Sequence, residues 1–300
     1  MRVLISGGSG LVGSALTGSL RADGHTVAHF VRPGGKKEPG DVFWNPASAA
    51  ADVPAMEGYY AIVHLSGASI AEGRWTPKRK AILRSSRVDS TRVLVDVLAR
   101  LREPPKVFIC ASAIGYYGNR GDELLTESSG YGNDFLAILC RAWEGEAARA
   151  ASASIRTICA RFGVVLSMHG GALPKMLKPF KLGLGGRLGS GKQWMSWVML
   201  EDAVNILRAA IENEVWRGAV NLVSPNPVRN VEFTRALAGS LHRPAIFPAP
   251  AVALRLALGE MADALLLTSQ RVRPEKLIQN RYKFRYETLE PALQSVLSTA

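Results

Sequence analysis

The stretch VLISGGSGLVGSAL, residues 3–16, joins an apolar, strand-like run to the start of an amphipathic helix through a cluster of glycines. Glycine at such a junction permits a tight turn and lets backbone N–H groups approach a pyrophosphate, while the positive end of the helix dipole faces the same anion. A glycine-rich turn without a ligand is the alternative. The pattern predicts a dinucleotide-binding loop made of Gly7, Gly8, Ser9, Gly10, Leu11, Val12 and Gly13.

The end of the next strand-like run indicates which dinucleotide the loop would take. That run ends in HFVRP, residues 29–33, with Arg32 and no adjacent Asp or Glu. An acidic residue here would bind the ribose 2′-hydroxyl of NAD, whereas an arginine favours the 2′-phosphate of NADP. We therefore expect NADP, with NAD less favoured, and Lys36 and Lys37 as further positive charges. The alternative is that Arg32 is merely solvated.

Strand-like and helix-like segments alternate along the first part of the chain. This order implies βαβ units and hence a parallel sheet with helices on both faces. We expect an α/β Rossmann fold, a doubly wound parallel sheet with a smaller C-terminal substrate lobe. The strand-like runs span residues 2–7, 25–32, 59–67, 106–115 and 155–167, and the helical patterns span residues 13–24, 77–101 and 135–151.

The character of the sequence changes after Ser167, where residues 168–197 are rich in glycine, lysine and aromatic side chains. We expect an NADP-binding Rossmann domain over residues 1–167, completed by about 198–224, and a smaller substrate lobe from 168–197 and 225–300. Glycine-rich loops also serve only to turn the chain. The residues that suggest a cleft for an anionic or aromatic ligand are Trp75, Lys175, Lys181, Lys192, Gln193 and Trp194.

Bulk composition narrows the class of protein. The chain has 300 residues, 47% of them hydrophobic and 21% charged, so a sizeable core can form, and no uninterrupted apolar run approaches the length of a membrane span. The net charge is +12, but no nucleic-acid-binding motif accompanies it, so nucleic acid is not the favoured partner. Three widely spaced cysteines and the absence of metal-ligand spacing predict reduced thiols, no metal site and a cytoplasmic location. A homodimer is compatible with the sequence.

The sequence resembles the extended, epimerase-like branch of the short-chain dehydrogenase/reductase superfamily. Residues 7–13 are similar to its GGxGxxG loop, ASAIGYYG (111–118) to its serine-bearing strand end, and SWVMLEDAV (196–204) to its "hVdDva" stretch. ARFGVVLS (160–167) resembles the strand that reaches the nicotinamide, which implies a cofactor contact from Arg161. VHLSGAS (63–69) resembles the strand end beside adenine and ribose, which implies contacts from Leu65, Ser66, Gly67 and Ala68.

Three longer stretches resemble one atypical subgroup of that branch. They span residues 73–91, 182–204 and 269–277. The subgroup consists of NAD(P)-dependent epimerase/dehydratase family proteins with a distinctive C-terminal domain. The resemblance names no physiological substrate.

The usual catalytic helix of the branch reads Y-x-x-x-K-x-x-x-E, and here its first two letters are changed. Glu144 fits the last letter, so Cys140 falls at the lysine and Leu136 at the tyrosine. Tyr131 comes too early, because Phe135 follows it four residues later. Tyr116 and Arg120 have the spacing but lie in a strand-end loop. The sequence therefore lacks the usual Tyr–Lys pair.

Any acid–base group must come from elsewhere. The resemblance places Ser112, or alternatively Ala113, at the catalytic serine, and Arg87 at an asparagine. Arg87 would there hold the cofactor or an anionic substrate, and the alternative is that it is a solvated helix residue. Side chains that could transfer a proton or orient the substrate are Ser112, Tyr116, Tyr117 and Cys140, with packing as the alternative for each.

These observations leave two functions open. The first is an NADP-binding, epimerase-like oxidoreductase with an unknown small-molecule substrate. The second is a non-catalytic NADP-binding sensor or scaffold, which the missing Tyr–Lys pair favours. The sequence does not determine the substrate, the direction of reaction or the oligomeric state.

Overall fold

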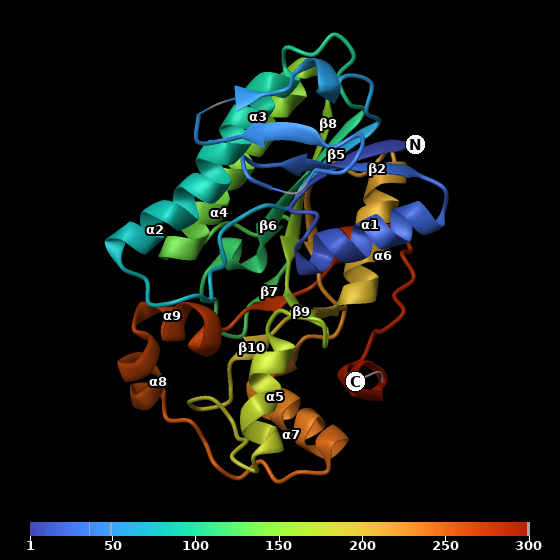
Figure 1. Cartoon of the computed structure of the whole chain (residues 1–300). Coiled ribbons are helices and arrows are strands. Elements are labelled where there is room, and N and C mark those ends of the chain that lie inside the picture. Colours follow the sequence, from blue (N-terminus) through green and yellow to red (C-terminus); the bar gives the residue numbers. More distant parts are fainter. Residues whose placement is uncertain (36, 49, 299–300) are drawn as a thin grey trace.

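A computed structural model describes residues 1–35, 37–48 and 50–298. Its centre is an eight-stranded sheet in the order β12-β8-β6-β5-β1-β2-β3-β4 (Figure 1). All neighbouring strands are parallel except β3 and β4, which confirms the predicted doubly wound sheet. The strands are β1 (Arg2–Ser6), β2 (Thr26–Val31), β3 (Val42–Asn45), β4 (Ala50–Ala51), β5 (Ala61–His64), β6 (Val107–Ala113), β8 (Arg156–Phe162) and β12 (Gly218–Leu222).

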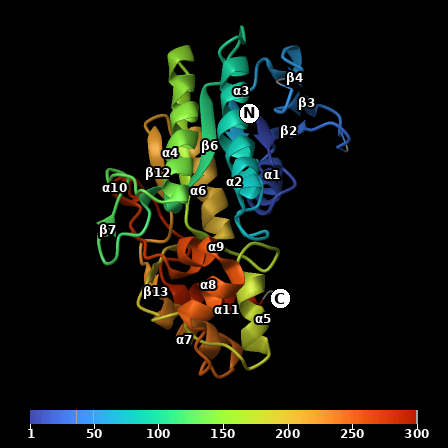
Figure 2. The same cartoon turned by 90° about the vertical axis from the view of Figure 1, so that its left-hand side faces the viewer.

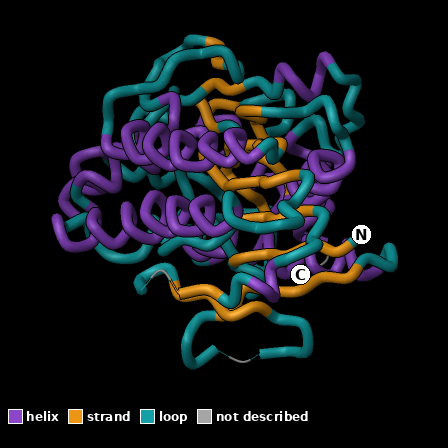
Figure 3. The backbone as a smooth tube through the Cα atoms, turned by 90° about the horizontal axis from the view of Figure 1, so that it is seen from above, coloured by secondary structure: helices purple, strands orange, loops and turns teal. Residues whose placement is uncertain are grey.

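Helices cover both faces of the sheet (Figures 2 and 3). Successive residues of β1 point to opposite faces, so Val3 and Ile5 pack in one core and Leu4 in the other. The first core contains Leu16 of α1 and Leu207 of α6. The second is covered by α3 and α4. These helices are α1 (Leu11–Ala22), α3 (Ser90–Leu98), α4 (Phe135–Ala148) and α6 (Leu200–Glu212).

The helix expected over residues 77–101 contains a wide turn. It consists of α2 (Pro77–Arg84), the π-helical turn η2 (Ser85–Asp89) and α3. Thr76 caps its start, because its side chain accepts a hydrogen bond of 3.2 Å from the backbone N–H of Arg79. Since a π turn has a wider backbone than an α-helical one, it redirects the side chains that it carries.

The prediction of one strand over residues 155–167 is wrong. The strand breaks at Gly163, where a Cβ would lie 2.7 Å from the carbonyl oxygen of Ser196. β8 ends before the break, and β9 (Val164–Leu166) leaves the main sheet to pair with β11 (Trp197–Met199). The close approach of two backbones therefore turns the chain out of the sheet.

A third hydrophobic core lies beyond the carboxyl ends of the main strands, in the lower half of Figure 1. It joins β9 and β11 to α5 (Leu173–Lys181), α7 (Asn230–Leu241) and α11 (Leu289–Ser298). α10 (Glu275–Gln279) instead packs against β12, and its Leu277 is buried in the core of the main sheet. The remaining elements are β7 (Leu124–Leu125), β10 (Trp194–Met195), β13 (Val228–Arg229), β14 (Arg271–Val272), α8 (Ala251–Leu258), α9 (Glu260–Ala262), η1 (Pro54–Met56), η3 (Ile114–Tyr117), η4 (Arg149–Ala153) and η5 (Asp263–Leu267).

None of the described helices combines the length and the apolar character needed to cross a membrane.

Candidate functional site

The glycine loop between β1 and α1 has room only for backbone. Gly7 has a φ of +73°, which glycine adopts without strain. A Cβ on Gly8 would lie 2.2 Å from the His29 ring, and a Cβ on Gly13 would lie 2.2 Å from the Gly7 carbonyl oxygen. Gly10 caps α1 without a side-chain hydrogen bond. The first N–H groups of α1 therefore keep the free donors and positive dipole end that suit a bound phosphate.

The segment after β5 lies against this loop. A Cβ on Gly7 would be 3.0 Å from the Leu65 carbonyl carbon and the Ser66 nitrogen. The Ser66 N–H donates a hydrogen bond of 3.3 Å to Ser6 Oγ, and the Ala68 N–H donates one of 3.1 Å to Ser86 Oγ. The structure thus brings residues 65–68 beside the loop, at the border where the strand order reverses.

Arg32 follows β2 and is exposed to solvent. Within the described residues its side chain makes no hydrogen bond or ion pair. Lys36 lies outside the described residues, and Lys37 is exposed. The nearby carboxylate of Asp41, which sequence reasoning passed over, is buried and accepts hydrogen bonds of 2.8 and 2.9 Å from the backbone N–H groups of His29 and Glu38. Both carboxylate oxygens of Asp41 already accept backbone donors, whereas the Arg32 side chain has no partner among the described residues.

His64 is the last residue of β5 and lies inside the core. Reasoning from the sequence had not singled it out. Its Nδ1 lies 2.7 Å from Ser6 Oγ, and its ring packs near Trp44 and Phe108. Complete burial lowers the pKa of His64 to about 3, so the imidazole is neutral at physiological pH. The apolar strand around it was the only sequence signal of this burial.

Five polar side chains form a chain of hydrogen bonds beneath the loop that follows β6. Ser112 Oγ donates to Glu144 at 2.6 Å, and Arg161 donates two hydrogen bonds of 2.7 Å to the same carboxylate. Arg161 also donates to the Tyr117 hydroxyl at 2.9 Å, and that hydroxyl donates to Asn221 at 2.7 Å. The network joins β6, η3, α4, β8 and β12. Sequence reasoning passed over Asn221 altogether and used Glu144 only to set the register of the helix.

Tyr116 and Tyr117 differ in their surroundings although they are adjacent. Tyr117 is fully buried, and burial raises its pKa to about 12 in spite of the nearby Arg161. Tyr116 is only half-buried, its ring lies 3.5 Å from the Arg161 guanidinium carbon, and its hydroxyl has no hydrogen-bond partner among the described residues. Of the two phenols, only that of Tyr116 is free for another partner.

Leu136 and Cys140 lie one turn apart on α4 and both face Gly115 of η3. A Cβ on Gly115 would be 3.3 Å from Leu136 and 4.0 Å from the Cys140 sulfur. Burial raises the pKa of the Cys140 thiol to about 12, so the thiol remains protonated at neutral pH. This position therefore offers neither a base nor a nucleophile.

Arg87 projects from η2 toward the same region. A Cβ on Gly67 would lie 3.2 Å from its guanidinium carbon, and the guanidinium lies 5.3 Å from the centre of the Trp143 ring on α4. The structure therefore places Arg87 between the end of β5 and the helix that carries Cys140.

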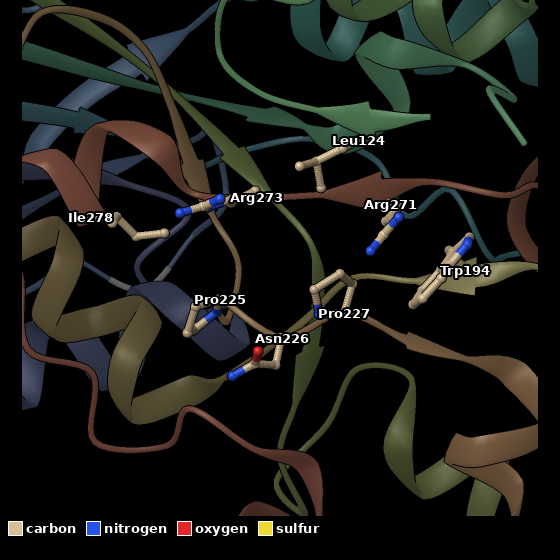
Figure 4. A pocket seen from close by; sticks show the side chains of 8 residues that line it. All are labelled: Leu124, Trp194, Pro225, Asn226, Pro227, Arg271, Arg273 and Ile278. Carbon is tan, nitrogen blue, oxygen red and sulfur yellow. The ribbon is translucent and has the colours of Figure 1, made fainter. Parts of the chain in front are cut away.

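Of the residues proposed to line a cleft, Trp194 is the one that lines the arginine-containing cavity of Figure 4. Lys175, Lys181 and Lys192 are exposed, and the Trp75 indole is buried and donates a hydrogen bond to the Ile70 carbonyl. The buried Gln193 amide donates to the Leu188 and Leu266 carbonyls. Trp194 lines a cavity of about 340 Å³ together with Leu124, Pro225, Asn226, Pro227, Arg271, Arg273 and Ile278 (Figure 4).

Two arginines of this cavity, Arg271 of β14 and Arg273 directly after it, flank the buried Val272. Figure 4 shows the Arg271 guanidinium directed toward Pro227, whereas that of Arg273 extends toward Ile278. None of the eight residues that line the cavity is acidic.

Comparisons with known proteins match nearly the whole chain. The NAD dependent epimerase/dehydratase family matches residues 3–222, and the domain of unknown function DUF1731 matches residues 249–296. An epimerase family protein of Mycobacterium bovis is 44% identical over 97% of this chain and 96% of its own length. The epimerase family protein YfhF of Bacillus subtilis is 38% identical over 99% of this chain and 98% of its own length.

A solved structure of another epimerase family protein is also similar to this chain. The crystal structure of the human epimerase family protein SDR39U1, isoform 2, with NADPH has a TM-score of 0.91 to this chain. The two chains are 32% identical, and the match covers 100% of both.

Proposed function

Because the chain belongs to the NAD dependent epimerase/dehydratase family, as an atypical extended short-chain dehydrogenase/reductase, we propose that it is an NADP-binding, epimerase-like oxidoreductase that acts on a small molecule. The glycine loop is the observation that carries the proposal. Two of its glycines have no space for a Cβ, and they hold the backbone close to the uncapped start of α1. A loop built this way fits a pyrophosphate.

The preference for NADP over NAD rests on Arg32. Its guanidinium follows β2, where the adenosine ribose of a dinucleotide lies in this fold, and it has no partner among the described residues. A 2′-phosphate would supply the missing negative charge. The human relative with a TM-score of 0.91 was solved with NADPH, which supports the same choice.

The cofactor contacts follow from this arrangement. When bound, the nicotinamide would supply hydride transfer to or from a carbon of the substrate. Arg161 would take part only indirectly, because its donors are engaged by Glu144 and Tyr117. The residues proposed to hold the dinucleotide are those of the loop at 7–13, together with Arg32, Leu65, Ser66, Gly67, Ala68 and Arg87.

Among the candidates for proton transfer, we favour Tyr116. Its hydroxyl is free, whereas Ser112 is bound to Glu144 and the pKa of Tyr117 is raised by burial. An anionic group on the substrate is supported by the arginine-lined cavity beside Trp194.

The cofactor claim is tested by titrating the purified protein with NADPH and NADH and following nicotinamide fluorescence. We expect tighter binding of NADPH, and loss of that preference in Arg32→Gln. Equal affinity for both cofactors in the unaltered protein would remove the NADP assignment. Gly13→Ala should abolish binding of both cofactors, because its Cβ would displace the Gly7 carbonyl.

A non-catalytic NADP-binding sensor or scaffold is the second candidate. It is favoured by Leu136 and by the protonated thiol of Cys140 at the positions of the usual catalytic pair. A panel of aldehydes, ketones and sugar nucleotides, followed by NADPH absorbance, separates the two functions. Turnover that Tyr116→Phe abolishes supports the enzyme. Tight NADPH binding without turnover of any compound supports the sensor or scaffold.

A further inference from the structure

A second pocket lies against α7, away from the glycine loop. Its volume is about 320 Å³, and it shares no lining residue with the cavity around Trp194. Val231, Thr234 and Arg235 form one wall, because residues three and four positions apart lie on one face of a helix. Figures 1 and 2 show α7 at the lower end of the molecule, well below α1. The pocket is therefore separate from the proposed cofactor site.

Backbone contacts hold the walls of this pocket together. The Val231 N–H donates a hydrogen bond of 2.9 Å to the Gly191 carbonyl, and the Ala249 N–H donates one of 2.9 Å to the Arg187 carbonyl. A Cβ on Gly191 would lie 3.2 Å from the Cβ atoms of both Arg187 and Val231. Glycine at position 191 thus lets the stem of Arg187 pack beside α7. Because three segments of the chain are joined in this way, the fold and not one loop defines the pocket.

Thr234 brings a hydroxyl without a partner to the pocket. Its side chain is buried, with 5% exposure, and makes no hydrogen bond within the described residues. A threonine inside a helix can donate to the carbonyl four residues earlier, as Thr17 does to Gly13 at 2.8 Å. An unpaired buried hydroxyl costs free energy, so the place of this one on the pocket wall points to a ligand.

Two exposed arginines make the pocket positive. Neither Arg187 nor Arg235 forms an ion pair among the described residues, and the Arg187 guanidinium donates one hydrogen bond, of 3.3 Å, to the Ser190 carbonyl. None of the residues that line the pocket is acidic. Glu232, on the same helix, accepts a hydrogen bond of 2.6 Å from the Arg229 N–H. The charge of the two arginines is therefore available to an anion.

The rest of the pocket is apolar. Its lining residues beyond α7 are Ala245, Ile246 and Pro248, and Ile246 is 70% exposed. An exposed branched side chain beside two cations suits a molecule that carries an apolar group next to its charge. The volume lies near the lower end of the range of about 300–1,000 Å³ that is usual for small-molecule sites.

We infer that this pocket binds a small organic phosphate, with the phosphate on the two arginines and the Thr234 hydroxyl and the apolar body against Ile246. Guanidinium groups make strong hydrogen bonds to phosphate oxygens, and two of them favour a doubly charged phosphate over a single carboxylate. The inference goes beyond the proposed function and does not depend on it.

The test uses four probes in calorimetry, with and without NADPH. They are phenyl phosphate, inorganic phosphate, benzoate and benzyl alcohol. We expect phenyl phosphate to bind at least about fivefold more tightly than each of the others, and with the same affinity when NADPH is present. Equal binding of benzoate or benzyl alcohol, competition by NADPH, or no binding of phenyl phosphate would overturn the inference. Failure to bind NADPH would remove the proposed function and leave this inference intact.

Substitutions assign the bound probe to this pocket. Arg235→Gln and Thr234→Val should each weaken phenyl phosphate binding about fivefold or more, whereas Thr234→Ser, which keeps the hydroxyl, should change it less than about twofold. Arg243→Gln is the matched control, since Arg243 follows α7, is exposed and does not line the pocket, and it should leave the affinity unchanged.

Two results with these variants would overturn the inference. One is an unchanged affinity in Arg235→Gln or in Thr234→Val. The other is a loss of binding in Arg271→Gln in place of Arg235→Gln, which would put the anion in the cavity around Trp194. Thermal unfolding without ligand checks that the variants fold. Thr234→Val should keep the midpoint of the unaltered protein, because its hydroxyl has no protein partner among the described residues.

Discussion

Glu144 on α4 accepts two hydrogen bonds of 2.7 Å from Arg161 on β8, one at each carboxylate oxygen, and both side chains are largely buried. Burial lowers the pKa of Arg161, but the hydrogen bonds and charges of Glu144 and Tyr117 together raise it above its ordinary value. Such a pair is strongly coupled to folding, because removal of one partner leaves the other charge buried alone.

We therefore expect Glu144→Gln to lower the free energy of unfolding by about 3–5 kcal/mol, measured by urea denaturation. Glu123→Gln, which breaks the exposed pair with Arg120, should cost less than about 1 kcal/mol. If the two substitutions lower the free energy of unfolding equally, the buried pair stabilises the fold no more than the exposed pair does.

Substitution of the two adjacent tyrosines should affect the stability of the protein to different extents. Tyr117→Phe removes a buried hydroxyl that accepts from Arg161 and donates to Asn221, so it should cost about 1–3 kcal/mol. Tyr116→Phe removes a hydroxyl without a protein partner among the described residues and should change stability by less than about 0.5 kcal/mol. Thermal melts of both variants check this. A large loss in Tyr116→Phe would reveal a structural role for that phenol.

The three cysteines should be inert in the folded protein. All are buried, and burial raises the pKa values of Cys110, Cys140 and Cys159, that of Cys140 to about 12. A thiol reagent such as Ellman's reagent at pH 8 should therefore label none of them until guanidinium chloride is added, and then all three. Rapid labelling of one thiol in the native state would contradict the burial of that residue.

His64 should make stability depend on pH. Its pKa is about 3 in the folded state and 6.5 for a solvated histidine, so between these values the unfolded chain binds a proton that the folded chain does not. The neutral ring contributes its full share to the free energy of unfolding above pH 6.5. On acidification below that pH, the free energy of unfolding falls by about 1.4 kcal/mol per pH unit. When the pH is lowered from 7 to 5, the free energy of unfolding should fall by about 2 kcal/mol less in His64→Gln than in the unaltered protein. Chemical denaturation at both pH values measures this difference.

The exposed His242 provides a control for that titration, and His242→Asn should keep the full pH dependence. If His64→Gln and the unaltered protein show the same slope, carboxylates and not His64 govern the acid response.

Local patterns were enough to predict the sheet and the cofactor loop. The glycines at positions 7, 8, 10 and 13 and the alternation of strands with helices are properties of neighbouring residues, and backbone geometry follows from them directly. The register that sets Leu136 and Cys140 one turn apart is equally local. Strands β3 and β4 were not predicted, because they are short and lie at the sheet edge, where the apolar pattern is weak.

Tertiary structure decided which polar side chains are free and which are engaged. The hydrogen bond from Tyr117 to Asn221 joins residues 104 positions apart, and the break at Gly163 depends on the approach of Ser196 from a distant segment. Ser112, Tyr117 and Arg161 look like site residues in the sequence, but their partners are chosen by packing across β6, α4 and β12. The sequence by itself predicted a glycine loop for a dinucleotide and a helix that carries Leu136 and Cys140 where the related enzymes have their acid–base pair. Only the fold, by burying some polar groups together and leaving the Arg32 guanidinium and the Tyr116 hydroxyl without partners among the described residues, decided which side chains remain for a ligand.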